Sequence, residues 1–354
     1  MNRRRALAAV ATLAATAAAL AARSGPLRAQ AAPPPPATPP AAPLPYHLRD
    51  EVQAYIDELV ARHGLDREFI ERAFAQARYS EPAERLTTPS LVPPAARNWI
   101  DYRARNVDER RIRDGVQFLR EQRAALARAH AQYGVPAEVV CGILGIETVF
   151  GRNTGSFRTL DVLLTLSFDY TRRAPMYREE LAQFLLLCAE QGIDPLTPRG
   201  SFAGAVGLPQ FMPGSIRRWA VDFDGDGRVD LRNRDDAVGS VASFLAAHGW
   251  QRDLPIQFRA RAEAGVADVL GRGIVALYPW RDVAALGVAI DTPLDPDTRV
   301  LLLDLPWRTP AGEEGVEHRL GTVNMQALLH YNRSYFYGVA VADLARSISV
   351  RATA

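Results

Sequence analysis

The chain has 354 residues, enough for a large core divided among two or three subdomains. Its hydrophobic fraction of 48% and charged fraction of 23% are those of an ordinary soluble globular protein, and a formal net charge of +2 argues against a dedicated nucleic-acid-binding protein. All 42 basic residues are arginines, which excludes chemistry that needs a lysine nucleophile or Schiff base.

The N-terminus has the pattern of an export signal. A basic start, Arg3–Arg5, precedes an uncharged alanine-rich run and the small-x-small cleavage candidate Ala29–Ala31. We predict a cleaved signal peptide over residues 1–31 and a soluble mature protein outside the cytoplasm. The alternative, a membrane anchor, is weakened by the short and weakly hydrophobic run. Residues 32–45 are mostly alanine and proline and predict a stiff, extended linker.

Helical periodicity continues from Tyr46 onward and predicts a mostly helical protein. The periodic segments are 48–62, 65–78, 107–133, 136–151, 159–168, 176–190 and 236–248, and a last helix over 324–348 is expected to break at 331–332. Residues 299–305 and 317–323 resemble strands and predict a small antiparallel sheet. Cys141 and Cys188 both lie in apolar helical runs, so we expect two buried free thiols, although a disulfide stays open.

Within the helix that follows Pro136, the run 139–151 is almost wholly apolar and contains one carboxylate, Glu147. A helix this apolar is expected to be buried. Burial raises the pKa of a carboxyl group, which suits a general acid, although a structural Glu paired with an Arg would give the same pattern. Two further acids, Asp161 and Asp169, follow Glu147 but lie in less distinctive surroundings.

Two later segments carry further signals. Residues 200–215 are rich in glycine and small residues, which allows the backbone to approach a ligand or another element closely. The acidic loop that starts at Asp222 places aspartates at positions 1, 3 and 5 and glycine at position 6, as in an EF-hand calcium loop. Position 12 is Asn233 instead of Glu, so either the loop is longer and Asp235 or Asp236 closes the ligand shell, or the loop binds its ion weakly. We predict a structural calcium ion here, against the alternative of a solvated acidic turn.

Five segments, in order along the chain, resemble the lytic murein transglycosylase B family. They are GILGIETVFGRNTG, TLDVLLTLSFDYTRRA, GSFAGAVGLPQFMPGSIRRWAVDFDGDGRVDL, DAVGSVASFLAAHGW and YNRSYFYGVAVADLA. The resemblance implies a mainly α (α+β) fold with a lysozyme-like helical core, a helical N-terminal domain and a small β-containing insertion. The expected parts are an N-terminal domain over 46–135, a catalytic core with the calcium loop over 136–252, the insertion over 253–323, and a C-terminal segment over 324–354 that completes the core.

The resemblance also implies an activity, cleavage of the β-1,4 bond between N-acetylmuramic acid and N-acetylglucosamine in peptidoglycan with closure of a 1,6-anhydro ring. Glu147 matches the family's single acid/base. Calcium ligands are implied at Asp222, Asp224, Asp226, the Arg228 carbonyl and Asp236, and no organic cofactor is expected. Sugar-contacting positions are implied at Ser201, Gln210 and Tyr102, a basic pair along the groove at Arg172 and Arg173, and a segment folding over the cleft at Tyr331, Asn332 and Tyr337.

The implied partners are peptidoglycan glycan strands, with cell-wall synthesis proteins as further candidates, for a monomer in the periplasm. Two positions depart from the family pattern: Leu208–Pro209 precedes Gln210 where Tyr-Gly is usual, and Met176 replaces an aromatic residue. Two other functions fit the residues less well. A muramidase that hydrolyses the same bond would need a second carboxylate, and a calcium-dependent wall-binding module would not turn over substrate.

Overall fold

The computed structural model describes residues 44–88, 98–263, 265–271, 273–276 and 278–354. By its internal contacts the chain divides at Pro43, and the described residues all belong to the unit Leu44–Ala354. The predicted signal peptide and almost all of the linker therefore lie outside the described residues. Within the described part, no helix is both long enough and apolar enough to cross a bilayer.

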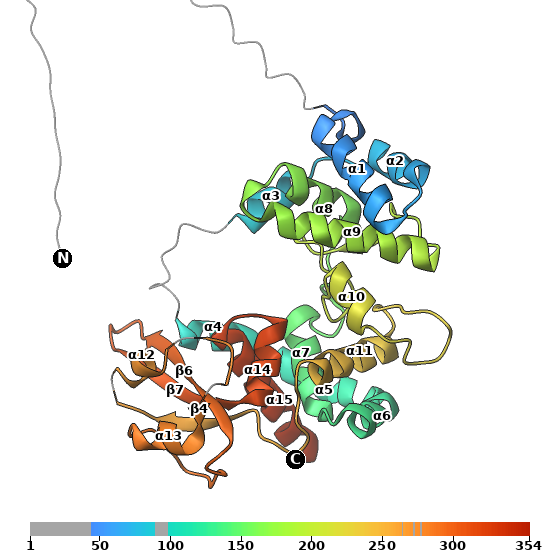
Figure 1. Cartoon of the computed structure of the whole chain (residues 1–354). Coiled ribbons are helices and arrows are strands. Elements are labelled where there is room, and N and C mark those ends of the chain that lie inside the picture. The colour runs from blue at the N-terminus through green and yellow to red at the C-terminus, as the bar shows by residue number, and fades with distance from the viewer. Residues whose placement is uncertain (1–43, 89–97, 264, 272, 277) are drawn as a thin grey trace, which may run out of the picture. The chain divides into compact units, whose positions relative to one another are not determined.

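Helices dominate the described chain, and a small sheet accompanies them (Figure 1). The helices are α1 (Asp50–His63), α2 (Arg67–Ala75), α3 (Glu81–Thr87), α4 (Trp99–Asn106), α5 (Glu109–Glu121), α6 (Arg123–Tyr133), α7 (Ala137–Thr148), α8 (Thr159–Phe168), α9 (Ala174–Gln191), α10 (Pro213–Trp219), α11 (Arg234–Ala247), α12 (Val266–Leu270), α13 (Trp280–Ala285), α14 (Val323–Tyr331) and α15 (Tyr335–Thr353), with 3-10 turns η1 (Tyr46–Leu48) and η3 (Thr171–Arg173). The strands are β1 (Phe157–Arg158), β2 (Arg199–Gly200), β3 (Gln257–Arg261), β4 (Tyr278–Pro279), β5 (Ala289–Ile290), β6 (Arg299–Arg308) and β7 (Glu314–Thr322). The prediction of a mainly α fold with a small sheet is confirmed.

The main sheet has the strand order β4-β6-β7-β3-β5 and antiparallel pairing throughout. Its centre is the hairpin of β6 and β7, paired from Val300 opposite Thr322 to Arg308 opposite Glu314. Both predicted strands are therefore present. β6 continues past its predicted end at 305, whereas β7 begins before its predicted start at 317 and ends one residue earlier than predicted. Leu303, Leu305 and Leu320 are fully buried along this hairpin, as expected for the packed face of a sheet.

Two helix predictions have different outcomes. The single helix expected over 107–133 was wrong, because the chain forms α5 and α6 with a break at Gln122, which has φ −101° and ψ 21°. The expected break in the last helix is confirmed, since α14 ends at Tyr331 and Asn332 is extended. Cys141 and Cys188 are both buried and free, as predicted.

The buried residues fall into several clusters. Residues of η1, α1, α2 and α3 pack with α8 and α9, whereas residues of α5 and α6 pack with α7, α11 and α15. The segment predicted as one N-terminal domain, 46–135, therefore contributes to two different clusters. The domain boundaries themselves stay a prediction.

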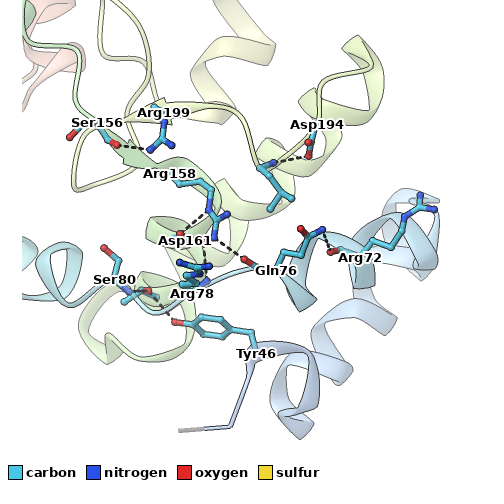
Figure 2. Close-up of polar contacts among 12 residues, drawn as sticks. Tyr46, Arg72, Gln76, Arg78, Ser80, Ser156, Arg158, Asp161, Asp194 and Arg199 are labelled. Carbon is cyan, nitrogen blue, oxygen red and sulfur yellow. Dashed lines mark hydrogen bonds and ion pairs between the residues drawn. The ribbon is translucent and has the colours of Figure 1, made fainter. Parts of the chain in front are cut away.

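Asp161 and Asp169 both form polar contacts that connect α8 to the N-terminal helices. Figure 2 shows Arg158 and Asp161 bridging to the chain after α2: Arg158 donates to Asp161 and to the carbonyl of Gln76 at 2.8 Å, and the amide of Arg78 donates to Asp161 at 2.9 Å. Asp169 forms an ion pair with Arg49 at 2.7 Å. Neither carboxylate is free to act on a ligand, so Glu147 stands apart from both.

Candidate active site

Glu147 lies in the last turn of α7, immediately before an unusual turn. Val149, Phe150 and Gly151 all have positive φ angles, of 51°, 57° and 90°. Two successive residues with side chains in this region are uncommon, and such strain persists only where the surroundings hold it. Thr148 holds it here: its buried hydroxyl donates to the carbonyl of Leu208 at 2.9 Å and accepts from the amide of Gly151 at 2.9 Å.

Small residues on α7 bring α15 close to the acid. A Cβ added at Gly142 would lie 2.8 Å from the carbonyl oxygen of Val341, and one at Gly145 would lie 2.9 Å from Leu344. The two helices therefore approach at van der Waals contact along these glycines. This approach places the hydroxyl of Tyr337 on α15 at 2.7 Å from Oε1 of Glu147, to which it donates a hydrogen bond.

The surroundings of Glu147 favour its protonated form. The carboxyl group is half-buried, and loss of solvent raises its pKa from 4.5 to about 7, although the hydrogen bond from Tyr337 acts in the opposite direction. Among the described residues, neither a second carboxylate nor an arginine contributes to this shift. At neutral pH, Glu147 can therefore both donate and accept a proton.

Three tyrosines surround the acid. Burial, followed by the negative charge of Glu147, raises the pKa of Tyr102 and of Tyr331, so both hydroxyls lie within electrostatic reach of the carboxylate. Tyr331 stacks on Tyr337 with ring centroids 6.3 Å apart and donates to the carbonyl of Pro209 at 2.5 Å. Tyr102 is half-buried and packs edge-on against Phe336 at 5.4 Å. Tyr337 is 2% exposed, so it supports the acid from the core and offers no open face for sugar stacking.

The glycine-rich segment forms a compact turn structure beside the end of α7. Ser201 accepts hydrogen bonds from the amides of Ala203 and Ala205 through its hydroxyl, at 3.3 and 3.1 Å. Gln210 adopts a positive φ of 54° and donates its side-chain amide to the carbonyls of Thr154 and Gly207. The Pro209 carbonyl, next to Gln210, accepts from Tyr331, which ties this segment to the C-terminal helices.

Three predicted substrate-contacting residues are less closely connected to Glu147. Arg172 and Arg173 lie in η3 at the start of α9, and both are exposed. Asn332 is exposed at the end of α14, where its carbonyl accepts from the amide of Ser334 at 2.7 Å. In the part of the chain that the structure describes, no recorded interaction joins these three residues to the acid, so their substrate contacts stay a prediction.

The acidic loop draws three aspartates together. Oxygens of Asp222, Asp224 and Asp226 all lie within 4.8 Å of one another. The loop backbone turns around them, because the amides of Gly225 and Gly227 both donate to Asp222 at 2.8 Å and both glycines have positive φ. A set of oxygen donors this dense fits Ca²⁺, which prefers many carboxylate and carbonyl ligands.

Asp236 takes a different position from these three. It is 1% exposed, and its two oxygens accept from the backbone amides of Phe223 and Asp230, both at 2.7 Å. Asp236 therefore holds the two ends of the loop together by hydrogen bonds to backbone amides. Its service as a metal ligand, like that of the Arg228 carbonyl, stays a prediction.

Sequence reasoning missed several residues that shape the site. Thr148, already described, fixes the turn after the acid, and the only signal was a hydroxyl residue next to Glu147 in an apolar run. Arg111 donates to the carbonyl of Gly145 at 3.0 Å, one turn from the end of α7. It lies in a charged amphipathic segment, where one arginine could not be told from the others. Asn233 donates to Asp224, so position 12 of the acidic loop supports a candidate ligand without being a carboxylate.

Comparison with known proteins agrees with this arrangement. A family model described as a transglycosylase SLT domain matches residues 47–346. Membrane-bound lytic murein transglycosylase B of Escherichia coli (strain K12) is 38% identical over 305 residues, which cover 84% of this chain and 82% of that protein.

Solved structures show the same similarity. The soluble lytic transglycosylase SltB1 of Pseudomonas aeruginosa aligns with a TM-score of 0.78 and 37% identity, covering 86% of this chain and 100% of that one. The lytic transglycosylase Slt35 of Escherichia coli, solved in complex with calcium, aligns with a TM-score of 0.74 and 36% identity, covering 85% of this chain and 93% of that one. The predicted lysozyme-like core with a β-containing insertion is confirmed by these neighbours. The chain therefore belongs to the transglycosylase SLT family and is a lytic murein transglycosylase, an enzyme that acts on peptidoglycan.

Proposed function

We propose that Glu147 alone carries both proton transfers of the reaction. As an acid it protonates the oxygen of the bond from N-acetylmuramic acid to N-acetylglucosamine, and the bond from C1 to that oxygen breaks. As a carboxylate it then takes the proton of the muramic acid C6 hydroxyl while that oxygen bonds to C1. The ring closes as a 1,6-anhydro sugar, no water is consumed, and Glu147 regains its proton.

The observation that carries this proposal is the environment of Glu147. A pKa of about 7 leaves both protonation states populated at neutral pH. Most hydrolytic glycosidases use two carboxylates, one of which activates water or attacks the sugar. The next two acids after Glu147 along the chain, Asp161 and Asp169, are engaged with Arg158 and Arg49. A reaction that needs no water-activating group fits a single acid better than hydrolysis does.

The other site residues take supporting roles in this proposal. Tyr337 fixes the carboxyl group and moderates its pKa, while Tyr331 holds the segment that contains Gln210 against it. Ser201, Gln210, Tyr102 and Asn332 contact sugar, and Arg172 and Arg173 lie along the groove for the carboxylates of the stem peptide.

We also propose that a calcium ion binds at Asp222, Asp224 and Asp226, with the Arg228 carbonyl and Asp236. The carboxylate cluster supports this proposal, as does the calcium complex of Slt35, a relative with 36% identity. The ion stabilises the loop between α10 and α11 and takes no part in the proton transfers. Since the substrate is a wall polymer, the proposed compartment is the periplasm.

Digestion of purified sacculi tests the proposal. Wild type is expected to release muropeptides that end in 1,6-anhydro-muramic acid, identified by mass spectrometry, and Glu147→Gln is expected to release almost none while remaining folded. One positioned acid/base typically contributes roughly 10²–10⁴-fold to a rate. Reducing ends in place of anhydro ends would identify a muramidase, and full activity of Glu147→Gln would overturn the role of the acid.

A further inference from the structure

A cavity of about 860 Å³ lies at the end of α7 opposite to Glu147. It is lined by Glu138 and Val139 at the start of α7, by the later turns of α15, and by residues of β3 and β7. At a rise of 1.5 Å per residue, Glu138 and Glu147 are separated by about 13 Å along the helix. The cavity is therefore distinct from the active site but shares both helices with it.

Polar groups form the floor of this cavity. Asp343 accepts from Nε of Arg103 at 2.8 Å and from Gln257 at 3.3 Å. Arg319 is 3% exposed and forms an ion pair with Glu317 at 2.5 Å. Two buried atoms of the floor, Nε of Arg319 and Oε1 of Gln257, have no hydrogen-bond partner among the described residues. Both atoms are fully buried, so a ligand in the cavity does not reach them, and the exposed arginines of the lining are the groups available to it.

The mouth of the cavity is positively charged. Arg259 and Arg346 line it and are exposed, and within the described chain neither side chain has an ion-pair or hydrogen-bond partner. Arg103 and Arg319 both lie beside Asp343, at 2.8 and 3.8 Å, and Arg259 is directly opposite Arg319 in the pairing of β3 with β7. Asp343 and Glu317 offset part of this charge, and Glu138 adds a further carboxylate to the lining, whereas Arg259 and Arg346 form no ion pair within the described chain.

We propose that this cavity binds carboxylates of a peptidoglycan stem peptide outside the cleavage site. Guanidinium groups match carboxylates through paired hydrogen bonds, and a cluster of them at a cavity mouth suits a ligand that presents more than one carboxylate. The proposal rests on the proposed function only for the identity of the polymer. A second binding site for the same polymer raises the effective concentration of glycan at the active site.

The test measures binding without turnover, in the Glu147→Gln variant. Cosedimentation is compared on intact sacculi and on sacculi from which the stem peptides have been removed. Arg259→Ala with Arg346→Ala is expected to weaken binding to intact sacculi about fivefold, in keeping with partly exposed charged contacts. The matched control, Arg261→Ala with Arg281→Ala, removes the same charge from residues that are 73% and 59% exposed and line no part of this cavity, and is expected to bind like the parent.

Three results would overturn the proposal. Two of them are equal weakening by the control pair, which would indicate a general charge effect, and equal weakening on peptide-free glycan. Unchanged binding by the Arg259 and Arg346 variant would overturn it as well. Since cleavage is absent from this assay, a wild type that makes no anhydro products would refute the proposed function and leave the binding result unaffected.

Discussion

Replacing Glu147 with Gln is expected to make the protein more stable at alkaline pH. The pKa of Glu147 is raised from its ordinary value of 4.5 to about 7, so the folded state binds this proton more tightly than the unfolded state does. Stability from this group is fully present below pH 4.5 and is lost as the pH rises through 7. Each pKa unit is worth about 1.36 kcal/mol, which gives about 2–3 kcal/mol at pH 8 when solvent at a half-buried carboxyl group is allowed for.

Urea unfolding of both proteins between pH 4 and pH 8.5 measures this effect. All other titrating groups are shared, so the difference in unfolding free energy between variant and wild type isolates Glu147. We expect a small, constant difference below pH 4.5 that grows in favour of Gln by about 2–3 kcal/mol toward pH 8. A difference that does not change with pH would mean that the pKa of Glu147 is ordinary, and the argument for its double role would fail.

Three further predictions concern the supports of the site. Tyr337→Phe removes the hydrogen bond that lowers the pKa of Glu147, so the alkaline limb of the pH–rate profile should move to higher pH while maximal turnover falls; an unmoved limb would contradict the contact. Calcium should raise the melting temperature, by the equivalent of about 2.7 kcal/mol at a hundredfold excess over Kd, and Asp224→Asn should abolish the rise; persistence of the rise would exclude this loop. Gly142→Ala places a methyl group 2.8 Å from a backbone oxygen of α15 and should lower unfolding free energy by about 1–3 kcal/mol, whereas Gly273→Ala, with nothing within 4 Å, should not.

Local patterns in the sequence were sufficient for much of the fold. Apolar periodicity located most helices, and two apolar β-rich runs located the central hairpin of the sheet. The break at Gln122 was missed because residues 107–133 keep one amphipathic pattern across it. At the break the neighbouring helices change, since α5 packs mainly against α15 and α7, and α6 mainly against α11. The break at 331–332, by contrast, was predicted correctly, and its segment is one of those that resemble the family.

The site was predictable where a residue type stands out from its surroundings. Glu147 is a lone acid in an apolar helix, and the aspartates of the acidic loop keep a fixed spacing. Tyr337 was expected over the cleft, but its hydrogen bond to Glu147 depends on the approach of α15 over Gly142 and Gly145, which links residues 190 positions apart. Arg111 and Thr148 act through backbone carbonyls, and no sequence pattern specifies which carbonyl a side chain will meet.

Digestion of sacculi in water enriched in ¹⁸O tests the central claim most directly. If Glu147 closes the 1,6-anhydro ring with the substrate's own hydroxyl, the new muramic acid ends carry no ¹⁸O, and each product is lighter by one water than its hydrolytic counterpart. One ¹⁸O atom at each new reducing end would show that water attacks C1, and would contradict a reaction run by a single acid/base.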